Sequence, residues 1–450
     1  MSTRRPTILH RLEFGLYRAV ERILGALSLE DCVHLGRIVG GIIHLVTPKY
    51  RRLVGRNVRI ATAAEAPSDA EIDALVEETF KRGAANFLAS FRTQISSTAE
   101  LLERIDDQGM KVLEPSLTEG KGLVVAMPHM GNWEALSQLG TTYSPDRRYG
   151  GVYRPLDNPL MDEFTRQRRT ADGALLFSRK DGFHAPASLL REGGALVVLA
   201  DQRAGASGVP LPFFGKLTTC SPLPHLMARR SKSSVAILGI VTTGPARWRL
   251  EMMPVPDGGG TEAIMNQLEQ AMRRSLSDVF WFHDRWRTDS ARPLSLFTKT
   301  DPAIARSATV PLRVILSTPP EADEQGINRF ITEMLSLRPD LRIERLAPRK
   351  ATSPDPRVIL HDWDPTTPPE HSIGLIKKVD ASYQTPLDAA LLLGGELSLA
   401  HAAKTLGIRS RIGLGVRGKP WTRSLAMATS DEQWADLAHQ LAQVPTRRQS

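Results

Sequence analysis

Short apolar runs separated by helical patterns restrict this chain to an α/β fold. Residues 123–127, 195–200 and 235–241 are continuous runs of small and branched apolar residues. Such runs fit strands that are buried on both faces of a sheet, and they are too short for a core helix. Helices are predicted at about 132–139 and 262–276. Because strands alternate with helices, we expect a central, mostly parallel sheet flanked by helices.

A second α/β pattern follows a polar stretch at 290–309. It predicts strands at 312–317, 341–346 and 357–360 and helices at 322–337 and 397–406. A chain of 450 residues exceeds the usual size of one domain. We therefore expect N-terminal helices at 1–60, an α/β domain at 61–300 and a smaller, Rossmann-like α/β domain at 308–450.

The first sixty residues combine an apolar stripe with excess positive charge. They hold eleven Lys and Arg against four Asp and Glu, in a chain of net charge +9. Leu16, Val20 and Ile23 recur at helical spacing among arginines, which is the pattern of a basic amphipathic helix at a membrane interface. The apolar stretch at 33–46 is shorter than the roughly 20 residues of a spanning helix. We expect these helices to associate with an anionic cytoplasmic leaflet; the alternative is two ordinary helices packed on the domain.

Composition weighs against several other classes. Aromatic residues make up 6% of the chain, and neither an RNA-binding aromatic signature nor zinc-ligand spacing is present. Nucleic acid is therefore not an expected partner. Cys32 and Cys220 form no CxxC pair, and we interpret both as small apolar packing residues. No cofactor and no metal is expected.

His129 and Glu134 form the candidate reaction centre. The strand at 123–127 delivers His129 to its carboxyl end, where α/β sheets usually bind ligands. Asn132 is expected to cap the next helix, with Glu134 in the first turn. A carboxylate bonded to one imidazole nitrogen raises the basicity of the other, which can then take a proton from an alcohol. Spacing alone fits a capped helix with a hydrogen-bonded His better, and no third ligand for a metal is evident.

Four ordered blocks over about residues 10–290 resemble one family. The segment Pro128-His129-Met130-Gly131-Asn132-Trp133-Glu134 is similar to the H-x-x-x-x-D/E block of the lauroyl/myristoyl (late) acyltransferases of lipid A biosynthesis. Three later blocks follow in the family's order. The second is 153–160, with Arg166 and Arg169 downstream and then the basic step Arg179-Lys180-Asp181; the third is Asp201-Gln202 with Phe213-Phe214-Gly215; the last is 281–286.

This resemblance implies an O-acyltransferase at the cytoplasmic face of the inner membrane. It would transfer a fatty acyl chain from acyl-acyl-carrier protein to a hydroxyl of a lipid A precursor or related glycolipid, with His129 as general base and Glu134 as its partner. The family pattern assigns ten further residues to substrate binding: Asn132, Arg154, Arg166, Arg169, Arg179, Lys180, Asp201, Gln202, His283 and Arg285. Arg154 and Arg179 would hold acceptor phosphates or stabilise the oxyanion, and the alternative for each is a surface salt bridge. A lysophospholipid or other lipid acceptor, and a non-catalytic lipid-binding protein, stay as alternatives.

Residues 388–407 resemble a segment of heptosyltransferase-like glycosyltransferases. The shared pattern is an acidic residue, small residues and then His-x-Ala, here Asp388, Gly394-Gly395 and His401-Ala402-Ala403. Glu396 stands where that family usually has Asp, and the C-terminal third is too short for two Rossmann-like halves. We therefore favour a degenerate, non-catalytic module. The alternative is a bifunctional protein whose C-terminal domain binds a nucleotide-sugar or transfers a sugar.

Overall fold

The chain divides into two compact units. The first consists of Met1–Val54, Asp73–Gln202 and Ser221–His283, and the second of Gly55–Ile72, Arg203–Cys220 and Asp284–Ser450. Two early segments are thus grouped with the C-terminal third, while the predicted domain bounds at 60, 300 and 308 stay predictions. The computed structural model describes residues 5–110, 121–143, 147–171, 173–178, 182–256, 258–295, 302–318, 324–347, 353, 355–364, 368–428 and 430–442.

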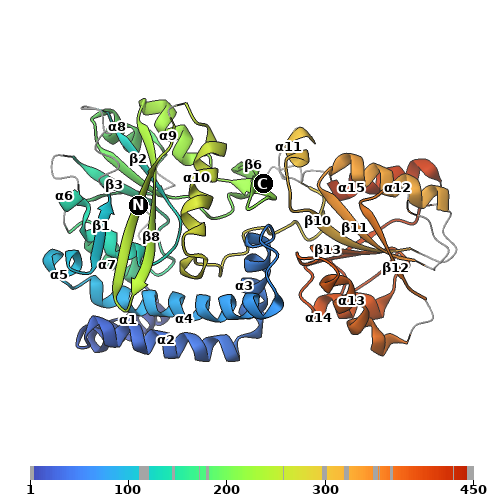
Figure 1. Cartoon of the computed structure of the whole chain (residues 1–450), viewed down its shortest axis with the longest axis horizontal. Coiled ribbons are helices and arrows are strands. Elements are labelled where there is room, and N and C mark those ends of the chain that lie inside the picture. Colours follow the sequence, from blue (N-terminus) through green and yellow to red (C-terminus); the bar gives the residue numbers. More distant parts are fainter. Residues whose placement is uncertain are drawn as a thin grey trace. The chain divides into compact units, whose positions relative to one another are not determined.

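A seven-stranded sheet forms the centre of the first unit (Figure 1). Its strands lie in the order β1-β9-β8-β2-β5-β3-β4. All neighbouring pairs are parallel except β8 and β9, so the predicted mostly parallel sheet is confirmed. The strands are Ile105–Gly109 (β1), Leu123–Met127 (β2), Tyr149–Tyr153 (β3), Leu175–Ser178 (β4), Ala195–Leu199 (β5), Ser234–Gly244 (β8) and Arg247–Pro254 (β9).

Alternate side chains of β2 enter two cores, one on each face of this sheet. Leu123, Val125 and Met127 pack with helices α2 and α4, whereas Val124 packs with α8 and α9. Because helices cover both faces, the strand needs no polar positions, which explains its continuous apolar run. The helices of this unit are Ile8–Gly25 (α1), Leu29–Val46 (α2), Pro48–Ala61 (α3), Asp69–Thr93 (α4), Thr98–Leu102 (α5), Gly140–Tyr143 (α6), Pro159–Arg169 (α7), His184–Arg191 (α8), Leu223–Ser231 (α9) and Thr261–Arg273 (α10). The end of α3 and the start of α4 belong to the second unit.

The N-terminal segment is helical, as the spacing of its apolar residues predicts. Helix α2 approaches α4 closely at Gly36 and Gly40, which lie one turn apart. A Cβ atom on either glycine would collide with the α4 backbone at Ala85 or Phe80. Helices α1, α2 and α4 share a small apolar cluster, and Figure 1 shows them along one edge of the first unit. Within the described residues, no helix has both the length and the apolar character needed to cross a membrane.

Six parallel strands form the main sheet of the second unit, in the order β12-β11-β10-β13-β14-β15. The strands and helices predicted beyond residue 309 are confirmed to within a few residues. The elements are Pro302–Arg306 (α11), Leu312–Ser317 (β10), Glu324–Leu337 (α12), Leu341–Ala347 (β11), Val358–Asp362 (β12), Ser372–Ala381 (α13), Ala389–Leu392 (β13), Leu397–Thr405 (α14), Ser410–Leu414 (β14), Arg423–Leu425 (β15) and Asp431–Ala442 (α15).

An antiparallel hairpin of β6 (Val209–Phe213) and β7 (Lys216–Cys220) belongs to the same unit. Its two-residue turn places Phe214 and Gly215 at positive φ, the conformation that short hairpin turns require. The rings of Phe213 and Phe214 are buried and pack edge to face with centroids 5.0 Å apart. Trp286 lies beside both rings and donates a hydrogen bond from Nε1 to the Phe213 carbonyl at 3.1 Å.

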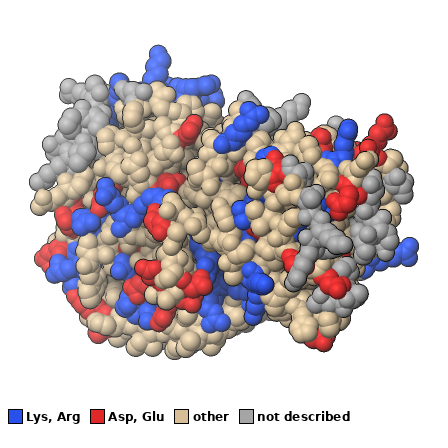
Figure 2. All heavy atoms as spheres, turned by 45° about the vertical axis from the view of Figure 1, so that its right-hand side comes forward, with Lys and Arg blue, Asp and Glu red and all other residues tan. Residues whose placement is uncertain are grey.

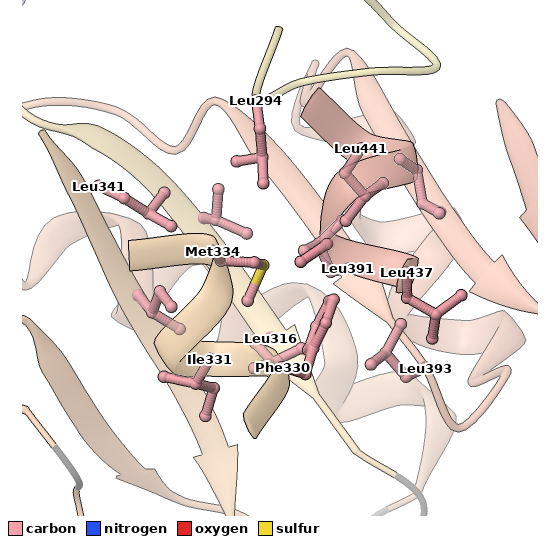
Figure 3. Close-up of a cluster of buried hydrophobic side chains, with 14 of the residues drawn as sticks. Leu294, Leu316, Phe330, Ile331, Met334, Leu341, Leu391, Leu393, Leu437 and Leu441 are labelled. Atoms are coloured by element: carbon pink, nitrogen blue, oxygen red, sulfur yellow. The ribbon is translucent and has the colours of Figure 1, made fainter. Parts of the chain in front are cut away.

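Helices α12 and α15 cover one face of the six-stranded sheet with a dense apolar core (Figure 3). Phe330 and Met334 of α12 are fully buried against Leu316 and Leu391 of the central strands. Helices α13 and α14 cover the opposite face, where a second cluster forms around Ile315. The two clusters explain why β10, like β2, is mostly apolar, with Arg313 and the terminal Ser317 as its polar residues.

Replacing Phe330 with Ala should strongly destabilise the second unit. The ring is fully buried, so its loss removes apolar contacts and leaves a cavity, at a cost of roughly 3–5 kcal/mol. Urea unfolding followed by near-UV circular dichroism measures the change. Leu397→Ala is the matched control, because that side chain is 52% exposed and should cost little; equal effects of the two variants would contradict the assigned core.

Candidate active site

Strands β2 and β5 bring His129 and Asp201 together. The two strands are parallel neighbours in register, with Met127 opposite Leu199 at their carboxyl ends. His129 and Asp201 each follow their strand end by two residues, so they emerge side by side from the same edge of the sheet. The Nδ1 atom of His129 lies 2.6 Å from Oδ1 of Asp201. Both side chains are largely buried, with 18% and 7% exposed.

The loop that carries His129 is pinned by the segment that follows α10. Phe280 donates its amide to the His129 carbonyl at 2.8 Å, and Gly131 donates its amide to the Asp278 carbonyl at 3.0 Å. Gly131 has φ of +57°, and a Cβ there would collide with Ile240. Only glycine therefore fits the turn that leads out of the site. The indole of Trp133 meets the imidazole edge to face, with centroids 5.4 Å apart.

Asp278 is a buried carboxylate that holds this segment in place. Thr242 donates to it from both its amide, at 2.8 Å, and its hydroxyl, at 2.6 Å. Arg82 and Asn86 of α4 add donors at 3.3 and 3.4 Å. Four donors, one of them the guanidinium cation of Arg82, satisfy the charge, so the carboxylate is stable without solvent. Reasoning from the sequence did not identify Asp278, Arg82 or Asn86, because Asp278 lies far along the chain from the two α4 residues and none of the three matches a local motif.

Glu134 pairs with Arg169, the last residue of α7. The Arg169 Nη2 atom donates to Glu134 Oε1 at 2.6 Å, and both side chains are partly exposed. This contact unites two residues that the family pattern assigned to separate blocks. The predicted pairing of Glu134 with His129 stays a prediction.

The segment after His129 corrects one expectation. Residues Trp133–Gln138 form a 3-10 helix rather than the expected α-helix, and Asn132 makes no side-chain capping hydrogen bond to it. Asn132 is buried and instead donates from Nδ2 to the Thr93 hydroxyl at 3.4 Å, where it helps anchor the loop to α4. A tight turn stabilised by tertiary contacts replaces local capping here.

Five of the remaining predicted site residues fall into three groups. Arg154 and Gln202 are exposed, and Arg154 directly follows β3, whose carboxyl end lies at the same edge as those of β2 and β5. Arg166 is partly exposed and pairs with Glu163 of its own helix. Arg179 and Lys180 lie outside the described residues.

The last predicted pair is divided between the two units. His283 is partly buried and ends the first unit. Arg285 is 3% exposed and belongs to the second unit, where it donates to the Thr218 hydroxyl and the Thr219 carbonyl at 3.0 and 3.2 Å. These contacts make Arg285 a buried part of the β6–β7 hairpin's surroundings.

A histidine held by a carboxylate is an arrangement that can act as a general base. A carboxylate on Nδ1 fixes the imidazole tautomer and leaves Nε2 as the basic nitrogen. Within the part of the chain that is described, no three His, Cys, Asp or Glu side chains gather in a way that would hold a metal ion.

Comparisons with known proteins define the family. The model of the bacterial lipid A biosynthesis acyltransferases matches residues 3–288. The match covers more than half of the chain and includes both His129 and Asp201, so the chain belongs to this family.

Two relatives show how far the similarity extends. A lipid A biosynthesis acyltransferase of Haemophilus influenzae is 28% identical over 142 residues, which are 31% of this chain and 44% of that protein. A phosphatidylinositol mannoside acyltransferase of Mycolicibacterium smegmatis is 25% identical over 233 residues, which are 50% of this chain and 75% of that protein. The chain thus spans less than half of the first relative and three quarters of the second.

Replacing Asp278 with Ala should destabilise the first unit by roughly 3–5 kcal/mol, since it leaves Arg82 and the Thr242 amide without their buried acceptor. Denaturant unfolding measures the loss. Asp73→Ala on the exposed side of α4 is the control and should be close to neutral. If the two variants unfold at the same denaturant concentration, Asp278 does not hold the His129 loop.

Proposed function

We propose that the chain is a membrane-associated acyltransferase. It moves a fatty acyl chain from acyl-acyl-carrier protein to a hydroxyl of a lipid A precursor or related glycolipid, at the cytoplasmic face of the inner membrane. The 2.6 Å contact between His129 and Asp201 carries this proposal, because it supplies an oriented base inside the part that matches the family.

His129 acts as the general base in this reaction. Its Nε2 atom takes the proton of the acceptor hydroxyl as the hydroxyl oxygen attacks the thioester carbonyl. When the tetrahedral intermediate collapses, the carbon–sulfur bond breaks and the proton passes from His129 to the leaving thiolate. Asp201 holds the ring by Nδ1 and stabilises the imidazolium that forms between these steps.

Glu134 and Arg169 form a second charged pair that serves the acceptor. The sequence predicts that Glu134 pairs with His129. The role proposed for Glu134 at the acceptor is supported by its ion pair with Arg169. Arg154, which follows β3 at the same sheet edge, is exposed and can reach an incoming phosphate. Guanidinium groups suit this task because their planar fork matches phosphate oxygens.

Two glycolipid classes fit the comparisons as acceptor. One relative is named for lipid A biosynthesis and the other for phosphatidylinositol mannoside. Both names describe phosphorylated glycolipids, which agrees with the basic residues of the site. A lysophospholipid stays as a further alternative, and mass spectrometry of the lipid that gains an acyl chain distinguishes the three.

The exposed apolar surface of α1 and α2 supports docking on a membrane interface. Leu12 and Leu16 of α1 are 67% and 68% exposed, and Ile38 and Ile42 of α2 are 63% and 54% exposed. The exposed basic residues at 49–52 follow directly after α2. An apolar face flanked by cations is typical of a helix that lies in the interface rather than across it.

The C-terminal third is proposed to be a Rossmann-like module without sugar-transfer activity. The six parallel strands lie in the order β12-β11-β10-β13-β14-β15. From β10 the chain adds strands toward one edge of the sheet as far as β12, and it then adds β13 to β15 on the other side of β10, as in doubly wound folds. Asp388, the acidic residue of the glycosyltransferase-like segment, is buried and binds Lys216 and Arg56. Its charge is therefore used within the protein, which supports a degenerate module over a bifunctional enzyme.

His129→Ala should abolish acyl transfer, because it removes the base. Asp201→Asn should lower transfer by about 10²-fold, because the base is still present but is no longer oriented by a carboxylate. Transfer of a radiolabelled acyl chain from acyl-acyl-carrier protein to total membrane glycolipid measures both. Asp73→Asn, on the exposed side of α4, is the charge-matched control and should keep full activity.

Glu134→Gln decides between the two carboxylates. If it costs more activity than Asp201→Asn, Glu134 is the functional partner of His129, and the role assigned to Asp201 is wrong. Full activity of His129→Ala would contradict the proposed mechanism altogether.

Removing the exposed apolar residues of α1 and α2 should release the protein from membranes. The fourfold variant with Leu12, Leu16, Ile38 and Ile42 replaced by Ser should bind anionic vesicles at least about tenfold more weakly, since each side chain contributes apolar area. Flotation with vesicles containing phosphatidylglycerol measures binding. Leu226→Ser, at an exposed position of α9, is the control; unchanged flotation of the fourfold variant would contradict the docking surface.

A further inference from the structure

Helix α1 has two faces with different surroundings. On its outer face, Leu12 and Leu16 are 67% and 68% exposed, and the proposed membrane docking uses this face. On its inner face, Phe14, Tyr17 and Glu21 recur at helical spacing and are partly or fully buried. The inner face packs against α7, the helix whose end reaches the candidate active site. One helix thus lies between the docking surface and the site.

The ring of Phe164, in the middle of α7, is the centre of this contact. Phe14 and Tyr17 of α1 meet the ring edge to face, with centroids 5.6 and 5.9 Å away. The guanidinium groups of Arg18 and Arg168 lie over the ring, 4.5 and 4.3 Å from its centre. A cation over an aromatic face is attracted to it. Packing and charge therefore hold α7 to α1 together.

Glu21 is a buried carboxylate of α1 that faces the end of α7. It is 4% exposed and forms ion pairs with Arg18 and Arg168. Arg168 also donates to Gln94 of α4 at 3.0 Å. On the face drawn in Figure 2, basic and acidic side chains are largely interspersed, as in exposed ion pairs. Breaking the ion pair of a buried carboxylate has a larger effect than breaking an exposed one, because water screens the buried charge less.

Arg168 and Arg169 are the last two residues of α7, and they meet different partners. Consecutive residues of an α-helix lie about 100° apart around its axis. Arg168 therefore meets Glu21, whereas Arg169 meets Glu134 at 2.6 Å. The carbonyls of a last helical turn lack partners within the helix, and helix ends fray. The ion pair with Glu21 opposes fraying at the residue directly before Arg169.

Tyr17 links the two carboxylates electrostatically. Burial raises the pKa of its phenol, and the negative charges of Glu21 and Glu134 raise it further, against the opposing charge of Arg168. The charges of the buried ion pair and of the candidate active site thus act on one side chain of α1. The inner face of α1 is therefore close enough to the pair of Glu134 and Arg169 to affect it.

We propose that Glu21 is a positioning residue, which through Arg168 orients Arg169 for the lipid acceptor and so couples membrane docking of α1 to the site. Docking holds α1 at the interface by its outer face, and the ion pair then holds the last turn of α7 against α1. Arg169 meets the acceptor headgroup in a fixed orientation as a result. This inference rests on the proposed function, because it assumes a lipid acceptor at Glu134 and Arg169.

Hydrogen–deuterium exchange of the full-length protein tests the coupling without any enzymatic activity. Vesicles containing phosphatidylglycerol should slow amide exchange at residues 166–171 about fivefold or more, the usual size of a coupling between two sites. Glu21→Gln and Arg168→Gln should both abolish this slowing, although both still float with the vesicles because the outer face of α1 is intact. Arg168 is partly exposed, so its variant should fold even where the buried substitution does not. Glu30→Gln, which breaks the ion pair of α2 with Arg104, is the matched control and should keep the slowing.

Acyl transfer to total membrane glycolipid in vesicles supplies the second readout. Glu21→Gln and Arg168→Gln should raise the apparent KM for the acceptor about fivefold or more and leave the KM for acyl-acyl-carrier protein unchanged. A merely structural defect would reduce the amount of active enzyme, which lowers the apparent kcat and changes neither KM. Glu30→Gln should match the unmodified chain.

The two readouts separate this inference from the proposed function. No slowing of exchange in the unmodified chain, or slowing and an acceptor KM that Glu21→Gln and Arg168→Gln leave intact, would overturn the coupling even if acyl transfer occurs. If slowing depends on Glu21 and Arg168 but the unmodified chain transfers no acyl group, the coupling between α1 and α7 is supported and the proposed function is wrong.

Discussion

The parallel, in-register pairing of β2 with β5 is the constraint on which the site depends. It fixes the two strand ends next to one another, with Met127 opposite Leu199. Two residues further along each chain, His129 and Asp201 are then close enough for a hydrogen bond. The buried strands act as a rigid support, so the orientation of the imidazole is set before any substrate arrives. A shift of the register by one residue would turn one of the two side chains to the other face of the sheet.

A second buried carboxylate organises the other unit. Asp388 accepts from Lys216 of the hairpin and from the amide of Arg313 at 2.8 Å each, and Arg56 of α3 is its third partner. Burial opposes ionisation, but Lys216 and Arg56 lower the pKa of Asp388 and keep it charged. The C-terminal third is thereby joined, within one compact unit, to two segments of the part that matches the family. Removing one partner of such a cluster leaves an uncompensated buried charge.

The elements that the sequence predicted well are those with a continuous apolar pattern. Strands β2 and β10 have the predicted bounds, because burial on both faces leaves a clear signal. Strand β3 was not predicted, since Gly150 and Gly151 interrupt its apolar character and its packing partner, β5, lies far along the chain. Strand β13 was interpreted as part of a small-residue motif, although its residues are fully buried in the sheet. The expected cap at Asn132 was wrong because contacts with α4, rather than local hydrogen bonds, hold that residue.

By itself, the sequence determined the α/β class, most of the buried strands, the family and the position of His129 just after a buried strand. It also contained every residue of the candidate site that the family pattern assigned. The tertiary structure alone brought Asp201, 72 residues away, to the imidazole of His129 and paired Glu134 with Arg169. It also placed His283 and Arg285, two residues apart in the chain, in different compact units. Local periodicity encodes which residues are buried, but the pairing of distant strands is fixed only when the whole sheet packs.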